Sequence, residues 1–101
     1  MRAMLLKGFL ISMIDLENTL PAMQQVIGGK IETTTLRDDG VMISDRDALP
    51  KERPYNNLAS LIAGTSIYGD AVIVGAEGDA FCDIPDPFLA LLNFPEDYFR
   101  Q

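Results

Sequence analysis

The sequence predicts one α+β domain over residues 1–101, with a mixed β-sheet that contains a β-hairpin and has two or three short helices packed on one face. Three observations support this class. One segment has helix spacing between start and stop signals, another has a turn signal between two strand-like runs, and two further runs are apolar enough for buried strands. The expected order is strand, helix, strand, strand, helix, strand, helix. With 48% hydrophobic residues, a chain of this length can form one core without disulfides or metal.

The first apolar run, residues 3–14, predicts a single strand that lies centrally in the sheet and is buried on both faces. Gly8 interrupts this run and indicates a β-bulge or a close approach of another backbone. A buried helix is the alternative, which is disfavoured because a glycine in a helix interior costs about 1 kcal/mol relative to alanine.

The next segment, "ENTLPAMQQVIGG", predicts a helix. Asn18 or Thr19 can cap its start by accepting a bond from a free backbone N–H, and Pro21 is tolerated in the first turn, where its missing N–H has no partner to lose. Gly28 and Gly29 end the helix, because glycine adopts the left-handed conformation at little cost. The apolar residues that form one stripe along it are Leu20, Met23, Val26 and Ile27.

A β-hairpin is predicted after this helix. "KIETTTL" is rich in alternating β-branched residues, "VMIS" supplies the return strand, and Asp39-Gly40 is a strong two-residue turn signal between them. Residues 45–54 contain many charges and two prolines, so we expect an exposed loop there.

Two more elements are predicted in the segment from residue 55 to residue 77. Leu58, Leu61 and Ile62 have the spacing of a short helix over residues 55–63, and Gly64 stops it. Residues 66–77 predict a strand, because their centre, "AVIV", is wholly apolar.

The tail predicts a terminal helix. Asp86 is its expected N-cap and Pro87 its first helical residue. Its buried side is expected to consist of Phe88, Leu91 and Leu92, and Pro95 ends the pattern.

Charge and cysteine content limit the compartment and the partners. With 15 acidic and 8 basic side chains the net charge is −7, which repels phosphate backbones, disfavours direct nucleic-acid binding and favours a basic partner.

Cys82 is the one cysteine, so a reducing compartment is expected. Arg2 precedes an apolar run as in a signal peptide, but Lys7 interrupts it and no small-residue cleavage site follows. No segment reaches the roughly 20 apolar residues of a membrane span, and we expect a cytoplasmic protein without membrane contact.

The residue types argue against catalysis. The chain has no histidine, which removes Ser–His and Cys–His nucleophile pairs, the commonest general base and the commonest metal ligand. Cys82 is expected to be a small buried apolar residue. We therefore expect a protein that is not an enzyme and has no cofactor.

Gly64 and Gly69 have the opening spacing of a phosphate-binding P-loop. Asp70 and Ala71, however, stand where that motif needs Lys and Ser or Thr, and an aspartate repels phosphate. The order is also reversed, because this segment runs from a helix to a strand. We interpret the two glycines as a helix stop and a turn.

Acidic residues cluster in the predicted loops and turns. We expect an acidic surface that includes Asp38, Asp39, Asp45 and Asp47, and a surface of this kind can imitate a DNA backbone. Asp45 and Asp47 resemble the start of a calcium loop, but its third ligand, its glycine and its distal glutamate are missing, so no metal site is expected. The alternative is a solvated surface that only keeps the protein in solution.

A polar group stands at the expected start of the second helix, where free N–H groups favour an anion or a polar ligand. We predict a binding site there, made of Arg53, Tyr55, Asn56 and Asn57. The alternative is that Asn56 or Asn57 simply caps the helix.

The segment "NTLPAMQQVIGGKIETTTL" resembles the opening of a family of small uncharacterised domains found in phages, plasmids and their bacterial hosts. The matching positions are Leu20, Met23, Gln24, Ile27, Gly28, Gly29, Ile31 and Glu32, and later "DGVMI", "IAGT…GDAVIVG" and the positions Leu49, Pro50, Asn56 and Ala59 are similar too. Pro21 departs from the family pattern, in which a good helix former is usual. The resemblance implies an accessory role in a mobile element, such as host takeover or evasion of host defence, and it transfers no catalytic residue.

These observations favour a protein that acts by protein–protein interaction, through its acidic surface or the start of its second helix. The alternative is a protein that sequesters a small ligand or a nucleotide derivative, with Arg53, Asn56 and Asn57 near the pocket. A homodimer is compatible with either reading.

Overall fold

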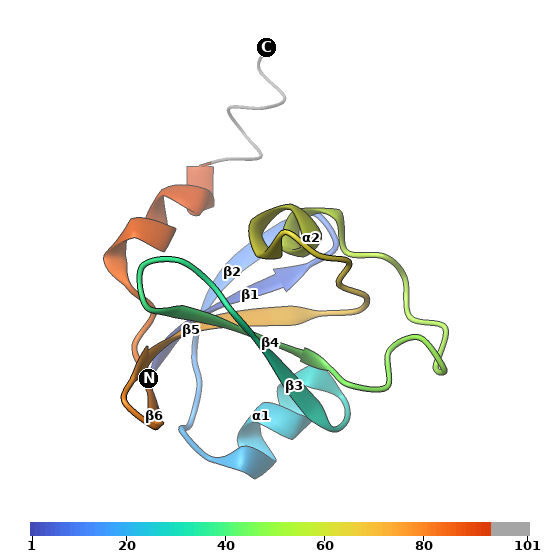
Figure 1. Ribbon diagram of the computed structural model, residues 1–101, viewed down its shortest axis with the longest axis horizontal. Helices are drawn as coiled ribbons and strands as arrows, with labels where there is room; N and C mark the ends of the chain where they lie inside the picture. The colour runs from blue at the N-terminus through green and yellow to red at the C-terminus, as the bar shows by residue number, and fades with distance from the viewer. Residues whose placement is uncertain (94–101) are drawn as a thin grey trace.

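The computed structural model describes residues 1–93, which form one antiparallel β-sheet with helices packed against it (Figure 1). Five strands lie in the order β2-β1-β5-β4-β3, and the short β6 pairs with the far end of β5. The strands are β1 Arg2–Lys7, β2 Leu10–Asp15, β3 Ile31–Thr35, β4 Gly40–Asp45, β5 Ala71–Glu77 and β6 Ala80–Cys82. The α+β class is confirmed. The predicted mixed sheet is wrong, because every strand pair among these residues is antiparallel, including the long-range pairs β1–β5 and β4–β5.

The first apolar run forms two strands instead of one, which changes the predicted element order. Gly8 has a φ of +62° and opens a two-residue turn, with Lys7 opposite Leu10 in the hairpin register. A glycine at the first turn position is typical of a type II′ hairpin. Only β1 matches the prediction of a central strand, since β2 lies at the edge of the sheet.

Two of the predicted helices end at the expected glycines, although α2 begins two residues later than predicted. Helix α1, Leu20–Ile27, is capped by Thr19, whose side chain accepts the N–H of Ala22 at 3.3 Å, and it ends at Gly28 with φ +88°. Helix α2, Asn57–Ala63, ends at Gly64 with φ +72°. The tail segment η1, Asp86–Asn93, begins as predicted but is a 3₁₀-helix, and the prediction for Pro95 lies outside the described residues.

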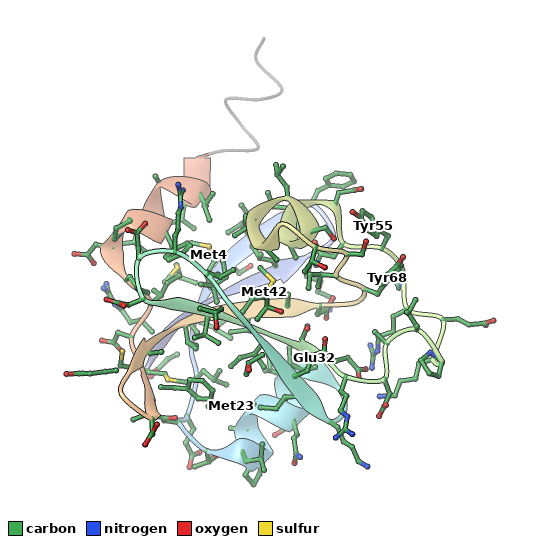
Figure 2. All side chains as sticks on the ribbon, viewed as in Figure 1. Met4, Met23, Glu32, Met42, Tyr55 and Tyr68 are labelled. Carbon is green, nitrogen blue, oxygen red and sulfur yellow. The ribbon has the colours of Figure 1, made fainter. Side chains whose placement is uncertain are left out.

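The helices cover both faces of the sheet, so the prediction of a single covered face is wrong. Met23 and Ile27 of α1 pack with Val72 and Val74 of β5 on one face. On the other face, α2 and η1 pack over a second cluster that includes Met4, Leu6, Met42, Leu58, Ile73 and Phe88. In Figure 2, Met4 and Met42 accordingly lie on the side of α2, and Met23 lies on the side of α1. Both faces need cover because β1 and β5 are apolar on both sides.

Gly75 of β5 provides a test of the packing between β5 and β6. A Cβ at this position would lie 2.4 Å from the carbonyl oxygen of Asp83 and 2.8 Å from Sγ of Cys82. We expect Gly75→Ala to lower the free energy of unfolding by about 2 kcal/mol, as overpacking in a core does, when measured by urea denaturation. Adding Cys82→Ala should restore only part of this loss, because the closer contact is with the backbone. Unchanged stability of Gly75→Ala would contradict this packing.

Candidate functional site

Asn56, the centre of the predicted binding group, is buried and fully hydrogen-bonded. Its side chain caps α2 by accepting the N–H of Ala59 at 3.0 Å, while Nδ2 donates to the carbonyl oxygens of Leu6 at 3.1 Å and Gly69 at 2.9 Å. The residue is only 2% exposed. These three bonds join α2 to β1 and to the segment before β5. Asn56 is therefore a structural cap, and its amide is not available to a ligand.

Arg53 belongs to an ion cluster around one buried carboxylate, and we define this cluster as Asp45, Lys51 and Arg53. Nε of Arg53 donates to Oδ2 of Asp45 at 2.7 Å, and Nζ of Lys51 donates to the same oxygen at 2.9 Å. Both cations also donate to the carbonyl oxygen of Gly28, at 3.1 Å from Arg53 and 3.2 Å from Lys51. The cluster thus fastens the loop after β4 to the C-terminal end of α1.

Asp45 was predicted on an acidic surface, and this prediction is wrong. Its side chain is 0% exposed, because the two cations and the end of α1 cover it. Burial raises the pKa of Asp45, but bonds donated by Lys51, by the backbone of Asp47 and by Arg53, together with the charge of Lys51, outweigh burial and lower the pKa below its usual 3.8. The carboxylate is therefore ionised and neutralised within the fold. The expected exposed loop over residues 45–54 is also partly buried, since Ala48 is only 5% exposed.

The ion cluster gives the two glycines after α1 a second role. A Cβ on Gly28 would lie 2.7 Å from Nη2 of Arg53, and a Cβ on Gly29 would lie 2.3 Å from Nζ of Lys51. Sequence reasoning found these glycines only as a helix stop. The two glycines leave room for these flexible side-chain ends, while Gly28 is favoured first of all by its left-handed φ of +88°.

The other two predicted binding residues lie at the surface. Tyr55 is 48% exposed and packs edge-on against Tyr68, with ring centroids 5.3 Å apart and an interplanar angle of 75° (Figure 2). Asn57, the first residue of α2, is exposed as well. The structure therefore separates the four residues into two structural ones, Arg53 and Asn56, and two exposed ones.

The remaining acidic residues do not form one surface with Asp45. Asp38 and Asp39 are exposed at the turn between β3 and β4, where both have positive φ, of 56° and 60°. The turn therefore centres on this pair, one residue before the predicted Asp39-Gly40. Asp47 is half-buried beyond the other end of β4, about 20 Å away along a strand of this length. Of the four residues predicted for the acidic surface, Asp38 and Asp39 are the exposed ones, and they lie together at the hairpin turn.

An apolar groove, which sequence reasoning missed, lies between α2, η1 and the β3–β4 turn. Its volume is about 400 Å³, and its walls include Leu61 and Ile62 of α2 and Phe88 and Leu91 of η1, with Leu36 and Arg37 at the turn. Leu61 shares the predicted helix spacing with Leu58 and Ile62, but it is 68% exposed, while Leu58 is buried. Leu92 was predicted on the buried side of the tail and is 42% exposed. The sequence signal for this groove was that the two short helices contain more leucines than one buried side can hold.

Among residues 1–93, no group of three or more His, Cys, Asp or Glu side chains is arranged to hold a metal ion. Within the same residues, no helix has the length and apolar character needed to cross a membrane.

Comparison with protein-family models matches residues 1–94 to DUF3846, a domain of unknown function, and the chain belongs to this family. No curated protein and no solved structure matches the chain. The resemblance to an uncharacterised domain family is thus confirmed at the level of the family, and the association with phages and plasmids stays a prediction.

Proposed function

We propose that this DUF3846 domain acts by binding a partner protein in the groove between α2 and η1, without covalent chemistry of its own. The observation that supports this proposal most is the exposure of Leu61, at 68%, on the wall of an apolar groove of about 400 Å³. Apolar surface rimmed by polar groups is typical of docking sites. Arg37 is the one charged residue among those that line the groove, and the other lining residues are apolar in type.

The occupant we propose is an apolar segment of the partner that also bears a basic residue. Arg37, the charged residue of the groove, lies 3.7 Å from Asp38 in an exposed ion pair, so the two residues together have no net charge. Asp39 adds an exposed negative charge at the same turn, and the whole chain has a net charge of −7. Such a surface favours a cationic partner and speeds its approach.

The alternative is sequestration of a small ligand or nucleotide derivative. The residues expected to bind that ligand are engaged elsewhere in this fold. The side chains of Arg53 and Asn56 are bonded to the chain itself. A mobile-element role, such as modulation of the host or evasion of its defences, is supported by the resemblance of the sequence, and we include it in the proposal as the setting in which a binding protein of this kind would act.

Leu61→Asp tests the groove, with Leu49→Asp as the matched control. The two leucines are equally exposed, at 68% and 66%, but Leu49 lies in the loop after β4, away from the groove. Peptides selected from a display library against the native chain should combine apolar anchors with Lys or Arg. By fluorescence anisotropy, Leu61→Asp should weaken their binding at least about 10-fold, which is a modest hot-spot effect, and Leu49→Asp should leave it unchanged. Equal binding to both variants would place the peptides elsewhere.

A further inference from the structure

Among residues 1–93, the main path of the sheet ends at the edge strands β2 and β3, which differ in charge. The edge at β3 is protected by charge, since it contains the exposed Glu32 (Figure 2) and is flanked by Lys30 and Arg37. The edge at β2 has no charged residue from Leu10 to Ile14, and Leu10 is 70% exposed. An apolar edge strand without such protection readily pairs with another chain.

We propose that β2 pairs with β2 of a second copy of this chain, antiparallel, about a two-fold axis that passes beside Ser12. No residue of β2 lines the groove between α2 and η1, so the two proposals can be tested separately.

The backbone of β2 offers suitable groups on its outer side. Lys7 and Leu10 flank the two-residue turn and so form a hydrogen-bonded pair, after which bonded and non-bonded pairs alternate along the hairpin. The N–H and C=O groups of Ile11 and Met13 therefore point away from β1. With the axis beside Ser12, Ile11 of one copy lies opposite Met13 of the other, and these two residues can exchange both backbone bonds.

The side chains favour this register over the one with its axis beside Met13. A two-fold axis perpendicular to the sheet keeps each face continuous, so the register can shift only by two residues. With the axis beside Ser12, Leu10 meets Ile14 of the other copy on one face, and Ile11 meets Met13 on the other. With the axis beside Met13, Ile11 would instead face the charged Asp15, and Ile14 would face Ser12. Because apolar side chains then meet apolar side chains on both faces, a second copy of the chain fits this edge.

Side chains along β2 have apolar surface left to bury in such a dimer. Ile11, Met13 and Ile14 are each only half-buried in the single chain, and Phe9 at the adjacent turn is 66% exposed. Pairing would cover these side chains and join two sheets into one continuous sheet. The same pairing would remove the open edge that otherwise favours aggregation.

Cysteine crosslinking tests the proposed register. Ser12→Cys, in a Cys82→Ser background, places two thiols directly opposite each other in a non-hydrogen-bonded pair, with Cα atoms about 4.5 Å apart, which a disulfide can bridge. Leu10→Cys is the control, since the two copies of residue 10 would lie about 14 Å apart. We expect a disulfide-linked dimer from Ser12→Cys under mild oxidation and none from Leu10→Cys.

The particle mass of the native protein in solution, measured by light scattering, should be twice the 11.1 kDa of one chain. Circular dichroism should confirm that both cysteine variants fold. A native chain that stays monomeric up to about millimolar concentration overturns the proposal, since even a weak dimer would then be populated. Equal crosslinking of the two cysteine variants, or a dimer in which Ser12→Cys does not crosslink, overturns the pairing of β2 with itself and assigns the edge to another use.

Discussion

Replacement of Asn56 by aspartate is expected to lower the free energy of unfolding by about 4 kcal/mol at pH 7, although aspartate is as good a helix cap as asparagine. Oδ1 of the new side chain would still accept the N–H of Ala59. Its second oxygen, however, would replace an Nδ2 that now donates to the carbonyl oxygens of Leu6 and Gly69. A negative charge would thus face two acceptors in a site that is 2% exposed, and both carbonyls would lose their donor.

Thr19→Asp is the matched control, because Thr19 caps α1 through the same kind of bond but is exposed. We expect this variant to be about as stable as the native chain. The Asn56→Asp carboxyl should have a raised pKa in the folded state, so its destabilising effect should shrink as the pH falls toward about 4. Urea unfolding at pH 7 and pH 4.5, followed by circular dichroism, measures both effects. A loss of less than about 1 kcal/mol at pH 7 would mean that the amide donor is dispensable.

Elements whose ends depend on local hydrogen bonds were predictable from the sequence. The start of α1 at Thr19 and its stop at Gly28 follow from side-chain and backbone bonds within a few residues. The cap and stop of α2 follow from Asn56 and Gly64 in the same way. The β3–β4 hairpin was predictable too, with its turn centred one residue earlier than expected because Asp38 tolerates positive φ.

Elements that depend on the path of the chain were not predictable. Residues 3–14 contain two strands, but both contribute apolar side chains to the core, so the hydrophobic pattern continues through the turn at Gly8. A glycine in such a run fits a bulge as well as a turn. The two covered faces could not be foreseen for a similar reason, since an apolar strand does not indicate which helix packs on which side.

The predicted site shows the same division between local and long-range contacts. The capping alternative for Asn56 was open to sequence reasoning, because a cap needs only the next three residues. The burial of Asp45 was not, because its two partners are separated from it by a loop that folds back onto the end of α1. In a run of charges such as "SDRDALPKERP", nothing distinguishes the one buried carboxylate from the solvated ones.

Asp45→Asn should lower the free energy of unfolding by about 3 kcal/mol at pH 7, because one partner of a buried ion pair is removed. Lys51 and Arg53 would lose the carboxylate oxygen that both now share. Their partial exposure, 39% and 30%, allows them to reach solvent, which keeps the loss below the upper end of the usual range. Asp47→Asn is the control. This substitution removes the same charge from the same loop, but the side chain of Asp47 is half-buried and lies outside the cluster.

The pH dependence of this difference identifies the ion cluster as its source. The pKa of Asp45 is lower in the folded protein than its usual 3.8, so the stability it contributes is present above that value and is lost as the pH falls through the folded pKa. The difference between the native chain and Asp45→Asn should therefore be constant from about pH 7 to pH 5 and shrink below about pH 4. A difference that does not change with pH would show that the amide disturbs packing at this position, and that the charge of Asp45 contributes little to holding the loop against α1.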